Sequence, residues 1–206
     1  MNSAEPTAGI PGAATNDNVG VVYVRSAKRA PLFSDDECDA VIAWAKGRRF
    51  ASREYFQKDD MSKRYDDGKS GKQISIDSRI SDERIAWFVR KVEEITVDLN
   101  RKIWRFDLTR LGPFAILRYD KGDHFLQHVD LQPPYCDRKI VVFIQLSPPE
   151  AYEGGALEYG IAPARKAPRG RGTVLAFPAW VPHRVARIRS GTRYAAAFFA
   201  LGPSFR

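Results

Sequence analysis

The sequence predicts an α+β protein in which two N-terminal helices support a jelly-roll core. Apolar residues recur at helical spacing in two stretches, at about 34–48 and 81–102. From residue 103 to about 203 the pattern changes, and short runs of β-branched and aromatic residues alternate with clusters of Gly, Pro and Asp. Short strands at such spacing are typical of an antiparallel sandwich or barrel, so we expect helices first and an all-β core second.

The N-terminal part of the chain divides into a tail and the start of a folded domain. Residues 1–20 are rich in Ala, Gly, Pro, Asn and Thr and lack a periodic apolar pattern, so we expect a flexible tail. The run VVYVR at 21–25 predicts a short strand. With 206 residues in total, the chain has the length of one domain, which we place at 21–206.

Capping residues and a long loop mark the helical region. Ser34, with Glu37 three residues later, forms a capping-box pattern at the start of the first helix. Ser81 can cap the second helix. Between the two helices, residues 51–74 are polar, charged and contain Gly and Ser. A loop of this length in a compact domain, with room for one strand, is either a mobile cover for a substrate or a disordered segment, and we expect the cover.

Composition and charge limit the partners of the protein. The net charge is +8, but the basic residues are scattered over short clusters, which favours a solvated basic surface over a nucleic-acid interface. No apolar run approaches the roughly 18 residues of a membrane span, and the N-terminus lacks the pattern of a secretory signal. The two cysteines, Cys38 and Cys136, make no disulfide framework. We therefore expect a cytoplasmic protein with reduced thiols.

Two of the histidines indicate a metal site. In QHVDLQPPYC, at 127–136, His128 and Asp130 are separated by one residue, so on a strand they share a face. Such a pair also occurs by chance on surfaces, but His183, at the start of another apolar strand, supplies a third ligand. Two His and one carboxylate suit non-haem Fe(II) with open positions, whereas zinc prefers a closed site or a third nitrogen or sulfur ligand.

Arg193 indicates a second binding function close to the metal. On a strand over 192–200 it shares a face with Ala195 and Ala197, and these small neighbours leave room for a ligand. A buried arginine needs an anionic partner, and its planar fork fits a carboxylate. The pattern therefore predicts a dicarboxylate that chelates the metal at one end and meets Arg193 at the other.

These motifs resemble those of the 2-oxoglutarate/Fe(II) dioxygenases, specifically the prolyl 4-hydroxylase-like branch. RYDKGDHFLQHVD at 118–130 is similar to that branch's Tyr-x-x-Gly-x-x-aromatic-x-x-His-x-Asp motif. RKIVVFIQLSPPEAYEGGALEY at 138–159 is similar to its Arg-x-hydrophobic strand followed by Gly-Gly, and RGTVLAFPAWVPHRVARIRSGTRYAAAFF at 171–199 resembles its closing segment. The resemblance is strong over residues 105–203 and looser over the two helices.

The resemblance implies a double-stranded β-helix that binds Fe(II), 2-oxoglutarate and dioxygen, with ascorbate as an optional reductant. It implies that Tyr119 hydrogen-bonds in the 2-oxoglutarate region. Gln145 stands where many relatives carry a tyrosine that touches this cosubstrate, and this departure leaves its role open. The reaction implied is hydroxylation with release of succinate and CO2.

The substrate is the least defined part of the prediction. Relatives hydroxylate prolyl residues in proteins, other peptidyl residues or free amino acids, so we expect a peptide, protein or amino-acid substrate. His124, on the strand face of His128, is a candidate for the substrate mouth or its rim. Trp180 is a candidate wall of the substrate pocket, with a packed aromatic residue as the alternative. The sequence makes no prediction of oligomeric state.

Two other functions use the same metal ligands. A nucleic-acid oxidative demethylase is favoured by the net charge, but that group resembles a pattern with two arginines closely flanking an asparagine, and RIRSGTRYAAAF at 187–198 lacks that asparagine. A cupin-like metal-binding module without turnover accounts for the metal ligands but not for Arg193 with its small neighbours.

Overall fold

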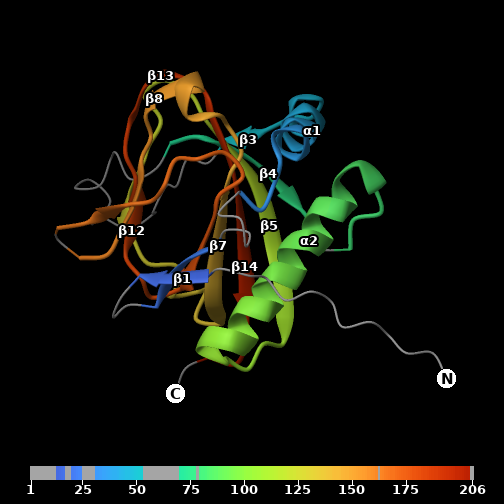
Figure 1. Ribbon diagram of the computed structural model, residues 1–206, viewed down its shortest axis with the longest axis vertical. Helices are drawn as coiled ribbons and strands as arrows, with labels where there is room; N and C mark the ends of the chain where they lie inside the picture. Colours follow the sequence, from blue (N-terminus) through green and yellow to red (C-terminus); the bar gives the residue numbers. More distant parts are fainter. Residues whose placement is uncertain are drawn as a thin grey trace.

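Two helices cover one face of a large antiparallel sheet, and a smaller sheet lies over its other face (Figure 1). The computed structural model describes residues 13–16, 20–24, 31–52, 70–77, 79–161 and 163–204. The resulting layers are the helices, the large sheet and the small sheet, as expected for an α+β protein with a jelly-roll core.

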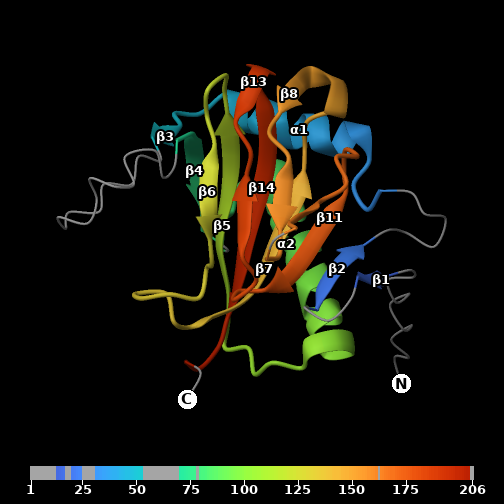
Figure 2. The ribbon, with the colours of Figure 1, turned by 90° about the vertical axis from the view of Figure 1, so that its left-hand side faces the viewer.

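The large sheet has eight strands in the order β1-β2-β11-β7-β14-β5-β4-β3. In this order they are Ala13–Asn16, Val21–Val24, Val174–Pro178, Arg138–Gln145, Arg193–Leu201, Arg110–Tyr119, Lys72–Ile76 and Ala51–Ser52. Figure 2 shows β14 between β7 and β5, with both helices behind the sheet. The strands nearest the centre are therefore covered on both faces.

The remaining strands form two smaller sheets. The four-stranded sheet has the order β10-β9-β12-β6, which is Arg165–Lys166, Leu157–Tyr159, His183–Val185 and Phe125–His128. The two-stranded sheet pairs β13, Ile188–Gly191, with β8, Tyr152–Gly154, which follows a short 3-10 turn at Pro149–Ala151. All of these pairings are antiparallel, and apart from the local β9–β10 pair they join segments far apart in sequence, as is typical of a jelly roll.

Alternation along the central strands separates two apolar cores. In β7, Ile140, Val142 and Ile144 face the helices. Val141 and Phe143, one residue out of step, face the space between the two sheets. Because both faces are buried, the strand is apolar almost throughout, and its last residue, Gln145, is an exception on the inner face.

The helices form as their capping residues and apolar stripes predict. Helix α1, Asp35–Lys46, begins after Ser34, whose hydroxyl accepts a hydrogen bond from the Glu37 amide while the Glu37 carboxylate accepts one from the Ser34 amide. Helix α2, Glu83–Leu99, continues as a π-helical turn over Asn100–Trp104. Both bury their apolar faces against the large sheet.

Three local predictions differ from the structure. Residues 13–16, expected in a flexible tail, form β1 and pair with β2, because the open edge of β2 offers hydrogen bonds to any extended segment. The second helix is capped by Asp82 and not Ser81, since the Asp82 carboxylate accepts from the Arg84 amide. The expected 51–74 loop contains β3 and the start of β4, and the part at 53–69 lies outside the described residues.

The described helices also bear on the membrane question. None of them is both long enough and apolar enough to cross a bilayer.

Candidate metal centre and arginine site

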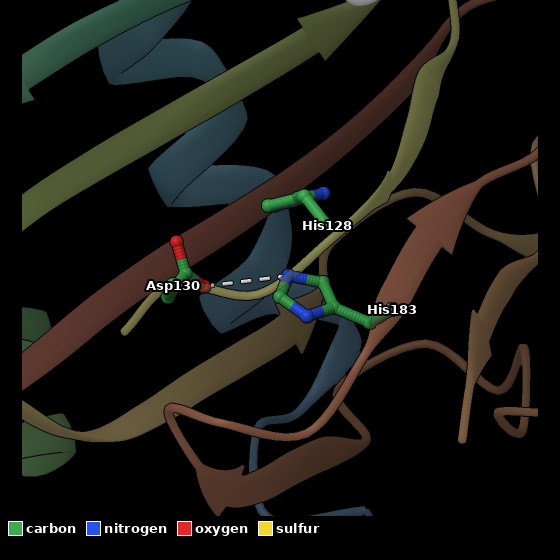
Figure 3. Close-up of side chains that lie close together, drawn as sticks. All are labelled: His128, Asp130 and His183. Atoms are coloured by element: carbon green, nitrogen blue, oxygen red, sulfur yellow. Dashed lines mark ion pairs between the residues drawn. The ribbon is translucent and has the colours of Figure 1, made fainter. Parts of the chain in front are cut away.

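Strand pairing brings the candidate ligands together. β12 pairs with β6 so that His183 lies directly opposite His128. Asp130 follows β6 in a loop, and its backbone amide and that of Leu131 both donate to the carbonyl of Ala179. These bonds tie the loop to the segment that leads into β12. One atom from each of the three side chains lies within 4.8 Å of the others (Figure 3).

Backbone carbonyls orient both imidazole rings. Nδ1 of His128 lies 2.8 Å from the carbonyl of Leu126, and Nδ1 of His183 lies 3.0 Å from that of Val181. A carbonyl can only accept, so each Nδ1 carries the proton and each Nε2 presents a lone pair. This tautomer leaves Nε2 free to bind a metal, and the hydrogen bond that selects it is typical of the surroundings of a metal site.

The contact between His183 and Asp130 calls for a cation. Nε2 of His183 is fully buried and has no hydrogen-bond partner among the described residues, and it lies 3.3 Å from Oδ2 of Asp130, the contact drawn as a dashed line in Figure 3. Burial holds the pKa of His183 below its ordinary value, and the charge of Asp130 opposes this shift without cancelling it. A neutral imidazole therefore turns its lone pair towards a carboxylate, an arrangement that a metal ion stabilises.

The donor set suits one class of metal ion. Two imidazole nitrogens and one carboxylate oxygen form the facial triad of non-haem Fe(II) enzymes, which leaves coordination positions open for other ligands. The residues present therefore fit the iron that the sequence predicts. His128 and His183 would bind through Nε2, and Asp130 through Oδ2.

Aromatic rings enclose the triad. Phe125 stacks on the ring of His128 with centroids 3.7 Å apart. Phe177 and Phe143 lie 5.0 and 5.5 Å from the ring of His183. Apolar walls of this kind lower the local dielectric and strengthen the interaction of the ligands with a cation.

Arg193 lies on the inner face of the large sheet, at the start of β14. It faces Tyr119 of β5 directly in register, with its guanidinium carbon 5.5 Å from the centre of the Tyr119 ring. Its Nη2 donates to Oε1 of Gln145 at 2.8 Å. The side chains of all three residues are buried, and Arg193 is 1 % exposed. The structure thus brings together the three residues predicted to contact the cosubstrate.

The guanidinium of Arg193 has a neutral partner but no anionic one. Among the described residues no carboxylate forms an ion pair with it, and its Nε is buried without a hydrogen-bond partner. A buried positive charge in this state is costly, so the surroundings of Arg193 favour an anion. Gly155, at φ +59°, leaves the space beside the Arg193 side chain free. A Cβ at this position would overlap Ile188 and lie 3.3 Å from Cδ of Arg193.

The metal triad and Arg193 lie on strand faces that border the same interior. Phe143 of β7 contacts the His183 ring, and Gln145 follows two residues later on the same strand face. Arg193, Ala195 and Ala197 alternate in the same way on β14, and Ala197 belongs to the core between the sheets. The inward direction predicted for Arg193 and its small neighbours agrees with this packing.

The two candidate substrate residues occupy different surroundings. His124 precedes β6 and is buried, not on an exposed rim; its backbone carbonyl accepts from the amide of Ser70. The register of β6 shifts between its two pairs with β12, and it is Phe125, not His124, that stacks on His128. Trp180 is 43 % exposed and packs edge-on against Phe106. Their roles towards a substrate stay predictions.

Sequence reasoning missed one contact of the metal ligands. Nη1 of Arg138 donates to Oδ1 of Asp130 at 2.9 Å, and both side chains are largely buried. Arg138 opens the strand after the QHVDLQPPYC stretch, so its place beside the triad follows from the return of the chain along β7. The signal available in the sequence was a basic residue at the start of a strand that is apolar from Ile140 to Ile144.

The comparison with protein families agrees with this site. Residues 114–201 match the model of the 2OG-Fe(II) oxygenase superfamily, and the match includes the triad, Tyr119, Gln145 and Arg193. No protein of curated function matches the chain in sequence. The similarity to this family therefore rests on the strands from β5 to β14.

Solved structures share the fold at low sequence identity. A prolyl-4-hydroxylase from Pseudomonas putida has a TM-score of 0.71 at 14 % identity, and the alignment covers 90 % of this chain and 94 % of that one. A prolyl hydroxylase from Trichoplax adhaerens, in complex with a hypoxia inducible factor peptide fragment, has a TM-score of 0.70 at 17 % identity and covers 89 % and 84 %. A collagen prolyl hydroxylase of Paramecium Bursaria Chlorella virus-1, in complex with 2OG, has 0.62 at 17 % identity and covers 89 % and 96 %.

The fold, the triad and the family match lead to one assignment. Residues 114–201 are similar to the 2OG-Fe(II) oxygenase superfamily, and the chain has the double-stranded β-helix fold of the solved prolyl hydroxylases.

Proposed function

We propose that this protein is a 2-oxoglutarate- and Fe(II)-dependent dioxygenase that hydroxylates a C–H bond of a prolyl or other amino-acid residue in a peptide or protein, or of a free amino acid. One observation carries the proposal. The same interior holds a triad that needs a cation, His183 with Asp130 and His128, and an arginine that needs an anion, Arg193.

The triad would hold the iron and would occupy only part of its coordination positions. His128 and His183 are preset as Nε2 donors, and Asp130 supplies the negative charge. When bound, Fe(II) together with 2-oxoglutarate and dioxygen supplies the oxidising chemistry, in which one oxygen atom enters the substrate and the other enters succinate as CO2 is released. The protein supplies binding and orientation.

Arg193 would bind the carboxylate of 2-oxoglutarate that lies away from the iron. Its guanidinium already donates one hydrogen bond to Gln145. The N–H group of its buried Nε has no acceptor among the described residues. A carboxylate accepts two such donors in parallel, which fixes its direction as well as its distance. Tyr119, directly across from Arg193 in β5, lies where it can contribute to the same pocket.

The aromatic rings would keep water from the reacting atoms. Phe143 and Phe177 pack against His183, and Phe125 covers His128. Exclusion of water strengthens the electrostatic interactions within a site and suppresses side reactions of oxidising species. This role needs apolar side chains without competing donors, which phenylalanine provides.

The proposal for the substrate rests on the fold. Three solved structures of the same fold are prolyl hydroxylases, and one of them was solved with a peptide fragment. At 14 and 17 % identity this likeness supports a substrate class and does not select among prolyl residues, other peptidyl residues and free amino acids.

A turnover screen tests the proposal. The protein is purified without oxygen, loaded with Fe(II) and supplied with 2-oxoglutarate, oxygen and either free amino acids or Pro-containing peptides. We expect succinate in step with a product 16 mass units heavier (one oxygen atom), and none from the His183→Ala variant. Succinate without any substrate dependence would contradict the hydroxylase proposal, and metal binding without succinate would favour a non-catalytic module.

A further inference from the structure

We infer that Arg138 is the positioning residue of the metal centre, which holds Asp130 so that one carboxylate oxygen faces the metal and the other does not. The inference rests on the proposed metal-dependent function. It concerns a residue that contacts the metal ligand Asp130 and acts through it.

The two oxygens of Asp130 have different partners. Oδ1 accepts a hydrogen bond from Nη1 of Arg138 at 2.9 Å, while Oδ2 lies 3.3 Å from Nε2 of His183. A carboxylate can bind a metal ion through one oxygen or through both. With Oδ1 engaged by a guanidinium, Asp130 offers the ion Oδ2 alone, and one more coordination position stays open for cosubstrate or dioxygen.

The guanidinium of Arg138 is itself held in place. Its central carbon lies 4.0 Å from the ring centre of Tyr135 and 3.9 Å from that of Phe199, so an aromatic ring from the loop and another from β14 both contact it. The side chain of Arg138 is 14 % exposed and that of Asp130 is 9 % exposed. Cation–π contacts and burial restrict the side chain, and a charged hydrogen bond in this environment is strong.

The tertiary structure brings Arg138 and its two aromatic neighbours together from three separate segments. The turn after Asp130 places Tyr135, β7 begins at Arg138, and the register shift between Ala200 and Leu201 of β14 lies next to Phe199. Lysine could carry the same charge at position 138, but it has no planar group to stack between two rings and no fork to orient a carboxylate.

Positioning and simple charge predict opposite effects on metal affinity. Arg138 carries a positive charge close to a cation site, so its removal would tighten metal binding if charge were its whole effect. If Arg138 orients Asp130, its removal weakens binding. Loss of a residue that orients a metal ligand typically costs about 10- to 100-fold in metal affinity or activity.

The experiment titrates the full-length protein with Co(II), which is stable in air, and follows its visible absorption. We expect Arg138→Gln to bind Co(II) about 10- to 100-fold more weakly. The visible absorption per bound Co(II) should fall. Without Arg138, Asp130 can bind through both oxygens, which raises the coordination number, and Co(II) of higher coordination number absorbs more weakly. Arg138→Lys should lie between Arg138→Gln and the unaltered protein.

A matched control separates orientation from loss of charge. Arg184 adjoins His183 in sequence, is half exposed, and pairs with Glu158 at 2.6 Å instead of with a metal ligand. Arg184→Gln removes the same charge and should bind Co(II) as tightly as the unaltered protein or more tightly. An equal loss in Arg184→Gln and Arg138→Gln would overturn the inference.

The remaining outcomes are also decisive. Unchanged or tighter Co(II) binding by Arg138→Gln overturns the inference while the metal centre stands. If Arg138→Gln does not fold, Arg138→Lys decides, and an unchanged affinity and spectrum in that variant overturns the inference. If the unaltered protein binds no Co(II) and no Fe(II), the proposed function itself fails, and Arg138 has no metal ligand to position.

Discussion

His183 of β12 and His128 of β6 face each other directly across one strand pair of the small sheet, with their ring centres 4.2 Å apart. Each ring is oriented by the carbonyl of the residue two positions before it. The pairing places two metal-binding nitrogens at one point, and Asp130 closes the set. The consequences can be measured without knowledge of the substrate.

Metal should stabilise the protein through this triad. A divalent ion removes the unfavourable contact between His183 Nε2 and Asp130 Oδ2. Binding to the folded state alone adds about 2.7 kcal/mol at a metal concentration 100 times the Kd. We expect Co(II) to raise the Tm of the unaltered protein and a chelator to reverse the rise, whereas Asp130→Ala should show neither effect in calorimetry. A full metal response in Asp130→Ala would show that the ion binds elsewhere.

Arg193 should lower the stability of the ligand-free protein while it strengthens the binding of 2-oxoglutarate. Arg193→Met removes a buried charge that lacks an anion, so without ligand the variant should be as stable as the unaltered protein or more so. Hydrogen bonds to charged groups contribute about 1.5–3 kcal/mol, so its KM for 2-oxoglutarate should rise roughly 10- to 100-fold. Urea unfolding and initial rates of succinate formation check the two effects. An unchanged KM would refute the role of Arg193.

Asp82 should make stability depend on pH at the junction of the helices. Its carboxylate accepts from Arg84, Trp44 and Arg48, and the Arg84 hydrogen bond is the largest cause that holds its pKa well below the usual range. A depressed folded pKa means that this stabilisation is present above the ordinary carboxyl pKa of about 3.9 and is lost as pH falls through the folded value.

The Asp82→Asn variant tests this sign. It should be less stable than the unaltered protein at pH 7, and the difference should shrink as the pH falls below about 4. Glu94→Gln is the matched control, because Glu94 lies on the exposed face of the same helix. Urea unfolding at a series of pH values measures both. A difference for Asp82→Asn that stays constant with pH would contradict the assignment.

The two thiols should differ in reactivity. Cys38 lies on the buried face of α1, and burial is the largest cause that raises its pKa to about 11. At pH 8 its reactive thiolate is therefore rare, and iodoacetamide should modify it slowly in the folded protein. Cys136 is half-buried and should react first. Mass spectrometry of peptides after timed alkylation distinguishes them, and equal rates at the two positions would contradict the prediction.

Much of the fold follows from local patterns in the sequence. The capping box at Ser34 and Glu37, the apolar stripes of both helices and the strand-like runs after residue 103 predict the α+β class, because each pattern reports which face of a short segment is buried. The residue types at 128, 130, 183 and 193 likewise indicate the chemistry, since few other combinations of side chains suit a metal and a dicarboxylate together.

The tertiary structure decided what depends on partners distant in the chain. β1 forms because β2 has an open edge, Asp82 becomes the cap because Trp44 and Arg48 approach it, and Arg138 reaches Asp130 because β7 returns beside the metal loop. The sequence by itself determined the helices, the strand-rich core and the metal-binding residue types. Only the fold decided which backbone edge is paired and which charge lies beside which metal ligand. The interaction energies of these contacts join segments that are distant in the chain, and sequence spacing does not show which distant segments meet.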